Sequence, residues 1–188
     1  VGLYAKTLLQ NFPFLPVEEE GRLEDPALRE NFIQRVYTYS RWKAIQQPQL
    51  TLSDLQNFHA QHKYIFMSHN QTKARELGAL LATSKNTELD SLADKYLEAM
   101  MLTLKFIATK KNHVNTLQHI QGYLKNNLDA DDKKELNVVI EDYRKGILPL
   151  IVPITLLRHH FRKHPDDYTD QSLYLSPYPG ELMLLNHI

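Results

Sequence analysis

Three histidines stand close together in the first half of the chain, at His59, His62 and His69. Their spacing places all three near one face of a helix, and imidazole nitrogens are common ligands of zinc and other transition metals. However, no carboxylate accompanies them, and the same face carries the apolar side chains of Phe58 and Ile65. We therefore expect the three imidazoles to point into a helical core and the chain to hold no metal. A metal site formed by these histidines is the alternative.

Two segments carry cations and no acid, at residues 105–125 and 143–164. Together they hold nine Lys or Arg residues, although the whole chain of 188 residues has 22 bases and 22 acids. Cations interleaved with amides and aromatic side chains are typical of surfaces that contact a phosphate backbone and stack bases. Solvated helix faces, or a face that contacts another protein domain, are the alternatives. The sequence predicts one RNA-facing surface that comprises Lys110, Lys111, His113, Asn115, His119, Lys125, Arg144, Lys145, Arg158, His159, Arg162 and Lys163.

The composition excludes several classes of site. The chain has no cysteine, which rules out disulfides, thiolate zinc sites and cysteine-ligated iron–sulfur clusters within it. This absence fits a reducing compartment, so we expect a cytoplasmic protein. No apolar run approaches the roughly 18 residues of a membrane helix, and we expect no membrane partner. The acidic run Glu18 to Glu20 is interpreted as a solvated segment or as an intramolecular partner of the basic surface.

Apolar periodicity predicts an all-α, single helical bundle-like domain of five to seven helices, because no alternating run of strand length is present. Asp25 followed by Pro26 is a helix-start signal, and Gly146 suits the left-handed position that ends a helix. We expect an extended N-terminal arm and a C-terminal tail rich in proline and tyrosine. The predicted helices span about 26–47, 51–81, 88–107, 110–125, 129–145 and 153–163.

The first of these helices has an apolar stripe at helical spacing, which is expected to face the core. Arg29, Arg35 and Arg41 lie away from this stripe. The stripe consists of Leu28, Phe32, Val36 and Tyr39.

Several blocks of sequence, in this order, resemble the YbgA-like domain of unknown function. They are LPVEEEGRLEDPALRENFIQRVY with the following Trp42, FHAQHKYIFMSH, KKNHVNTLQHIQGYLK, YRKGILPLIVPITLLRHHFR and YPGELMLLNH. The resemblance covers nearly the whole chain. That domain occurs alone and also behind a cysteine-bearing thiouracil-desulfurase-type domain, and residues 2–23 are similar to the junction of the fused form. The resemblance implies an arm from an upstream domain at 1–24 and a YbgA-like helical domain at 25–188.

The resemblance also implies a function. In the fused form, the catalytic domain uses an iron–sulfur cluster to remove sulfur from thiolated uracil, with thiolated tRNA as the expected substrate. This chain would then be an accessory domain that binds tRNA or another structured RNA and positions it for the fused or partner catalytic domain. It would hold no cofactor, the resemblance assigns it no catalytic residue, and the cluster would belong to the upstream domain. The alternatives are a stand-alone catalytic domain, metal-dependent through His59, His62 and His69, and a protein-interaction module.

Overall fold

The computed structural model describes residues 2–82 and 88–186, and this part of the chain contains nine α-helices and no strand. The predicted all-α class is confirmed, while the number of helices exceeds the expected five to seven. Short 3₁₀ turns at Glu20–Glu24, Gly122–Leu124, Leu173–Leu175, Gly180–Leu182 and Leu184–Asn186 complete the fold. The helices are α1 (Leu3–Asn11), α2 (Pro26–Ile45), α3 (Leu52–His69), α4 (Gln71–Ala82), α5 (Leu89–Leu104), α6 (Lys110–Gln121), α7 (Ala130–Lys145), α8 (Ile151–Lys163) and α9 (Asp167–Asp170).

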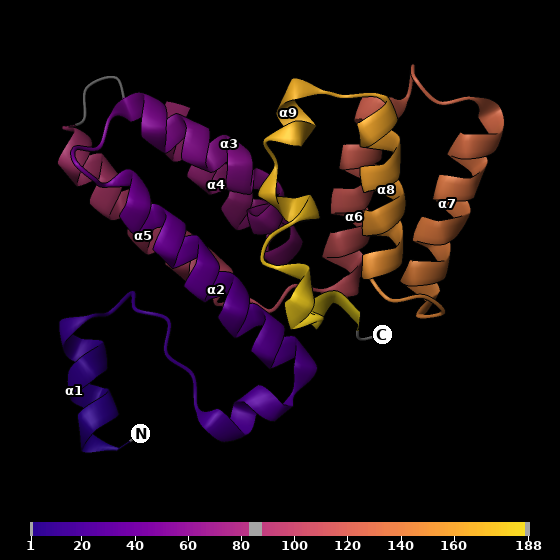
Figure 1. Cartoon of the computed structure of the whole chain (residues 1–188). Coiled ribbons are helices and arrows are strands. Elements are labelled where there is room, and N and C mark those ends of the chain that lie inside the picture. Colours follow the sequence, from indigo (N-terminus) through magenta and orange to yellow (C-terminus); the bar gives the residue numbers. More distant parts are fainter. Residues whose placement is uncertain (1, 83–87, 187–188) are drawn as a thin grey trace.

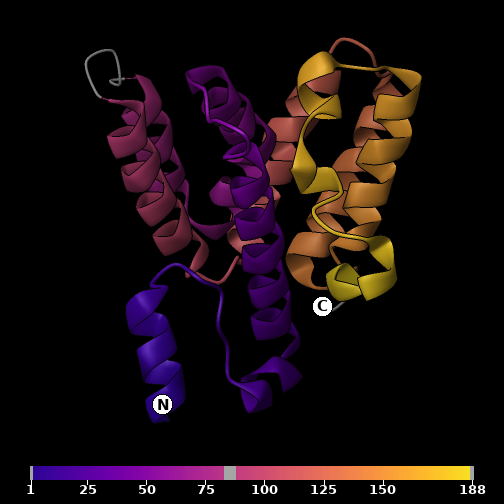
Figure 2. The ribbon, with the colours of Figure 1, turned by 60° about the vertical axis from the view of Figure 1, so that its left-hand side comes forward.

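The helices form two groups that lie side by side in both views (Figures 1 and 2). One group comprises α2 to α5, and the other comprises α6 to α8. Helix α3 packs against α6, so it joins the two groups, and the segment around residues 173–175 packs on both α3 and α8. Helix α1 stands apart from both groups and has no buried residue. None of the described helices has the length and apolar character that crossing a membrane requires.

Local capping signals set most helix boundaries. The carboxylate of Asp25 accepts hydrogen bonds from the backbone nitrogens of Ala27 and Leu28 at 2.8 and 3.0 Å, so α2 begins where predicted. Thr51 and Asp54 form a reciprocal capping box at the start of α3. Gly146, with a φ of 77°, ends α7 in the left-handed conformation that glycine adopts without strain.

Asn70 divides one predicted helix into two. The expected helix over 51–81 is interrupted there, because Asn70 adopts extended backbone angles with φ of −157°. Its backbone nitrogen donates to the carbonyl of Phe66, which closes α3. Its side-chain oxygen accepts from the nitrogen of Lys73 at 3.0 Å, which caps the start of α4. This interruption accounts for one of the additional helices, and the short α1 and α9 account for others.

Helix α2 buries its polar side, so the predicted core stripe was wrong. The expected residues Leu28, Phe32, Val36 and Tyr39 are only half-buried. The indole of Trp42 is fully buried, 5.4 Å from the ring of Phe58, and anchors the helix in the core. The other buried residues of α2 are polar, namely Asn31, Gln34, Arg35 and Thr38.

The chain before α2 is held to the domain by an ion pair. The Glu18 carboxylate lies 3.0 Å from the buried guanidinium of Arg35 and 2.9 Å from the exposed guanidinium of Arg22. Burial lowers the pKa of Arg35, and Glu18 opposes this effect. Glu18 is therefore an intramolecular partner, as one of the two interpretations of the acidic run proposed, but it pairs with α2 and not with the predicted basic surface.

Candidate functional site

Two of the three histidines point into the core, as predicted. His62 is fully buried, and its ring stacks on Phe58 with centroids 3.9 Å apart. His69 is buried near the end of α3, and His59 is half-buried. Among the described residues, no cluster of three or more His, Cys, Asp or Glu side chains is arranged to hold a metal ion.

Each histidine has a different hydrogen-bond partner. His59 shares a bond of 2.9 Å with the hydroxyl of Tyr96, and His62 donates to the carbonyl of Phe58 at 2.8 Å. Burial lowers the pKa of His59 and of His69 to about 4, and that of His62 to about 3. These imidazoles are therefore neutral at pH 7 and add no positive charge to a surface.

Helices α6, α7 and α8 alternate in direction (Figure 1). The predicted RNA-facing residues are therefore separated into two sets at opposite ends of this group. The first residue of α6 and the last residue of α7 lie at one end of this group. The last residues of α6 and α8 lie at the opposite end. The first end thus carries Lys110, Lys111, Arg144 and Lys145, and the other end carries His119, Lys125, His159, Arg162 and Lys163, with Arg158 one turn before the end of α8.

At the first end, several predicted residues have intramolecular partners. Arg144 donates to both carboxylate oxygens of Glu141, at 2.7 and 2.6 Å, and Lys145 lies 3.5 Å from the same carboxylate. His113 is buried, and its Nδ1 lies 2.8 Å from the hydroxyl of Tyr174. The imidazole of His113 therefore belongs to the interior and not to the predicted surface.

A basic groove of about 620 Å³ lies between α3, α4, α6 and α9. Lys63 and Arg75 supply its charge, and no described residue that lines it is acidic. Two residues predicted for RNA binding, Asn115 and His119, also line it. The remaining lining residues are Gln56, His59, Ala60, Tyr64, Met67, Gln71, Ala74, Gly78, Leu81 and Tyr168.

Three tyrosines and one lysine form a cluster at this groove. The rings of Tyr123 and Tyr168 are stacked, with centroids 5.6 Å apart and an interplanar angle of 13°. The hydroxyl of Tyr64 donates to that of Tyr123 at 3.2 Å. The Lys63 ammonium lies 5.7 and 5.8 Å from the rings of Tyr64 and Tyr168, within cation–π range. Burial raises the pKa of Tyr64 and of Tyr168, so both hydroxyls remain protonated.

Sequence reasoning missed the cations and most of the aromatic residues of this groove. A signal was present, because residues 55–75 carry Lys63, Lys73 and Arg75 and no acid. The histidines of the same segment were interpreted as core residues, with a metal site as the alternative. Of the residues that line the groove, only Asn115 and His119 were predicted to bind RNA.

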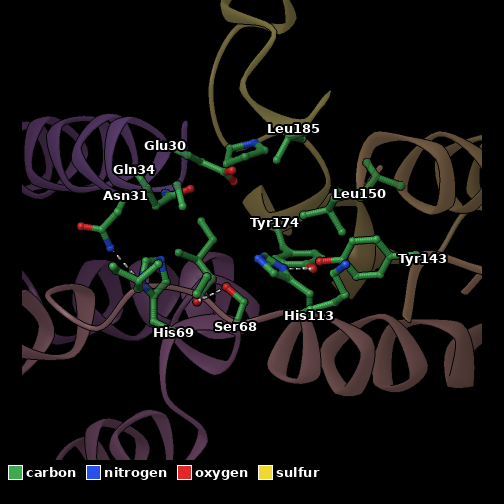
Figure 3. A pocket seen from close by; sticks show the side chains of 17 residues that line it. Glu30, Asn31, Gln34, Ser68, His69, His113, Tyr143, Leu150, Tyr174 and Leu185 are labelled. Atoms are coloured by element: carbon green, nitrogen blue, oxygen red, sulfur yellow. Dashed lines mark hydrogen bonds between the residues drawn. The ribbon is translucent and has the colours of Figure 1, made fainter. Parts of the chain in front are cut away.

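A second cavity, of about 170 Å³, lies where the two helix groups meet (Figure 3). Its polar wall is fixed by hydrogen bonds. The amide nitrogen of Asn31 donates to the carbonyls of Leu104 and Phe106 at 2.9 and 3.1 Å. Tyr178 donates to the carboxylate of Glu30 at 3.1 Å. The other polar residues of the lining are Gln34, Ser68, His69, Lys110, His113, Tyr143 and Tyr174.

Comparison with known proteins gives a family and one relative. Residues 63–179 match the family described as "Protein of unknown function (DUF1722)". The chain is 27% identical over 151 residues to the "Uncharacterized protein YbgA" of Escherichia coli (strain K12), and the match covers 80% of this chain and 89% of that protein. No solved structure matches. The matched range includes Lys63 and Arg75 of the groove, whereas the α2 side of the cavity lies before it.

Proposed function

The chain belongs to the DUF1722 family, and we propose that it binds RNA in the basic groove between α3, α4, α6 and α9. The bound molecule is tRNA or another structured RNA. As the resemblance to the fused form implies, the domain presents this RNA to a desulfurase-type catalytic domain on the same chain or on a partner. The domain itself then needs no cofactor.

One observation supports this proposal above the others: the described residues that line the groove include cations, amides and tyrosines and no carboxylate. Acids and bases are equally frequent in the chain, so an acid-free groove of this size is a local concentration of positive charge. Phosphate contacts from Lys and Arg supply most of the sequence-independent affinity for nucleic acids. Aromatic faces accept unpaired bases by stacking, whatever the base.

Part of the predicted surface is close to the groove in sequence. Residues 164–166 connect the end of α8 to α9, and Tyr168 of α9 lines the groove. The exposed cations Arg162 and Lys163 at the end of α8 are therefore close in sequence to the groove wall. Lys125 follows Tyr123, whose ring stacks on Tyr168. We therefore include Lys125, Arg162 and Lys163 in the proposed interface.

Binding of fluorescently labelled tRNA, measured at several salt concentrations, tests the proposal. The double variant Lys63→Ala/Arg75→Ala should bind more weakly, and the slope of log affinity against log salt should fall by about one for each lost phosphate contact. The matched control is Arg144→Ala/Lys145→Ala, which should bind normally. These two cations lie outside the groove at the C-terminal end of α7, where both pair with Glu141. Equal binding by the groove variant and the unaltered chain would overturn the proposal.

A further inference from the structure

We propose that the ring of Tyr123 stacks on one unpaired base of the bound RNA. This inference rests on the proposed function and makes it more specific, because it names the form of RNA that the groove accepts. Cations that contact phosphates accept paired and unpaired RNA alike, whereas a base can lie on a side chain only when it is not stacked inside a duplex. The ligand is then an RNA with a single-stranded nucleotide beside the groove.

Two of the three tyrosines in the cluster are already covered by their neighbours. Tyr64 is buried, with 3% of its surface exposed. The half-buried ring of Tyr168 meets that of Tyr64 edge-on, with centroids 6.1 Å apart and an interplanar angle of 88°, and it stacks on that of Tyr123. Tyr123 is the exposed member of the three, at 38%. A base that stacks on this cluster therefore stacks on Tyr123.

The ring of Tyr123 is held in position from one side. Tyr168 covers one face, with centroids 5.6 Å apart, and the Tyr123 hydroxyl accepts from that of Tyr64 at 3.2 Å. Among the described residues no other ring contacts Tyr123, so its exposed surface lies on the opposite face and along its edge. A ring that is fixed before the ligand arrives loses little freedom on binding. A parallel base would add a third ring to the stack of Tyr168 and Tyr123.

The exposed ring lies next to the cations of the groove. The Lys63 ammonium is 5.8 Å from the ring of Tyr168, on which Tyr123 stacks. His119, which lines the groove, is four residues before Tyr123, about one turn along the path from α6 into the 3₁₀ turn. Lys125 follows two residues after Tyr123 and is exposed. One RNA strand can therefore place phosphates at these cations and a neighbouring base on Tyr123.

The acids of α9 favour a base over a phosphate at this ring. Asp166 accepts from the backbone nitrogens of Tyr168 and Thr169, at 3.2 and 3.0 Å, and Asp167 is the next residue and is exposed. Both acids are thus close in sequence to Tyr168, on which Tyr123 stacks. Negative charge repels a phosphate but not an uncharged base. Cations in the groove and a neutral aromatic face near acids match the two parts of a nucleotide.

The test compares two labelled single-stranded ligands of equal length and phosphate number, oligouridine and an abasic RNA oligomer, each titrated into the whole chain. From the usual contribution of one stacked base, oligouridine should bind about 5- to 150-fold more tightly. Tyr123→Ala should bind the two oligomers nearly equally. Tyr123→Phe, which keeps the ring, should retain the difference. The matched control Tyr4→Ala, which removes an exposed tyrosine of α1, should retain it too.

Two results would each overturn the inference. One is equal affinity of the unaltered chain for the two oligomers, and this comparison needs no variant. The other is a preference for oligouridine that persists in Tyr123→Ala. Where circular dichroism shows that Tyr123→Ala does not fold, Tyr123→Leu, which keeps an apolar side chain, takes its place.

The groove variant separates this inference from the proposed function. Lys63→Ala/Arg75→Ala should bind both oligomers more weakly by the same factor and with a lower salt slope, because it removes phosphate contacts alone. Normal binding of both oligomers by this variant would refute the groove as the RNA site. Equal binding of both oligomers by the unaltered chain, together with weaker binding by the groove variant, would refute only the stacked base.

Discussion

The Nδ1 atom of His69 lies 2.6 Å from the carbonyl oxygen of Phe106. A carbonyl can only accept, so Nδ1 carries the proton and donates it. Asn31 donates to the same carbonyl at 3.1 Å and to that of Leu104 at 2.9 Å. Through these bonds, α2 and the end of α3 are tied to the link between α5 and α6, which is the link between the two helix groups.

The variant Asn31→Leu should therefore destabilise the domain. It removes the amide donor from the buried carbonyl of Leu104, whereas the carbonyl of Phe106 keeps its bond from His69. An acceptor that remains unsatisfied costs about 1–3 kcal/mol. Urea unfolding followed by circular dichroism measures the loss. The control is Asn57→Leu on the exposed side of α3, which should change stability by no more than about 0.5 kcal/mol. Equal stability of the two variants would show that the Asn31 bonds contribute nothing.

Acid should destabilise the domain through its buried histidines. The folded-state pKa values of His59 and His69 are about 4 and that of His62 is about 3, all below the ordinary value of 6.5. Between pH 6.5 and 4, the unfolded chain binds protons that the folded chain excludes. The free energy of unfolding should thus be highest above pH 6.5 and fall as pH decreases, by up to about 1.4 kcal/mol per pH unit for each histidine. Urea unfolding at a series of pH values measures this dependence.

The variant His62→Phe isolates one of these contributions. The Nε2 atom of His62 is buried without a hydrogen-bond partner in the described chain, and the ring lies between Phe58 and Phe66. A phenyl ring should fit this stack, so stability at pH 7 should be equal or higher. Between pH 6.5 and 4, the free energy of unfolding should fall less steeply with decreasing pH, because one fewer histidine takes up a proton on unfolding. An unchanged pH dependence would mean that His62 does not remain neutral in the folded state.

The sequence predicted those features that local chemistry determines. Asp25 with Pro26 and the glycine at 146 gave correct helix boundaries, because caps act within one turn. Asn70 was missed, because the apolar periodicity continues through it and only its extended backbone reveals the break.

Features that depend on distant partners were not predictable. Asn31 is buried because carbonyls 73 and 75 residues away accept its bonds, and no local pattern records this. For the same reason the cavity, formed by five helices and the C-terminal segment, left no motif in the sequence. The cationic residues could be identified from the sequence by their type. Their separation into two sets could not, because it depends on the directions in which α6, α7 and α8 run in the folded chain.

Gly78 should tolerate a small side chain but not a large one. A Cβ added there would lie 3.5 Å from Nε2 of His59, an ordinary contact. Because alanine is favoured over glycine inside a helix, Gly78→Ala should raise the free energy of unfolding by about 0.5–1 kcal/mol. Gly78→Leu should fill part of the groove and weaken tRNA binding. Ala79→Leu, at the next and exposed position of α4, is the control that should bind normally.

Arg158 and Arg162 test how far the RNA interface extends along α8. Both side chains are exposed, and within the described residues neither forms an ion pair, in contrast to Arg144, which is bound to Glu141. Arg158→Ala/Arg162→Ala should weaken binding of different RNAs alike and lower the salt slope by up to about two, because phosphate contacts carry no sequence information. Stability should change by no more than about 0.5 kcal/mol per substitution. Undiminished tRNA binding at moderate salt would limit the interface to the groove around Lys63 and leave the α8 face as solvated surface or as a contact for another protein domain.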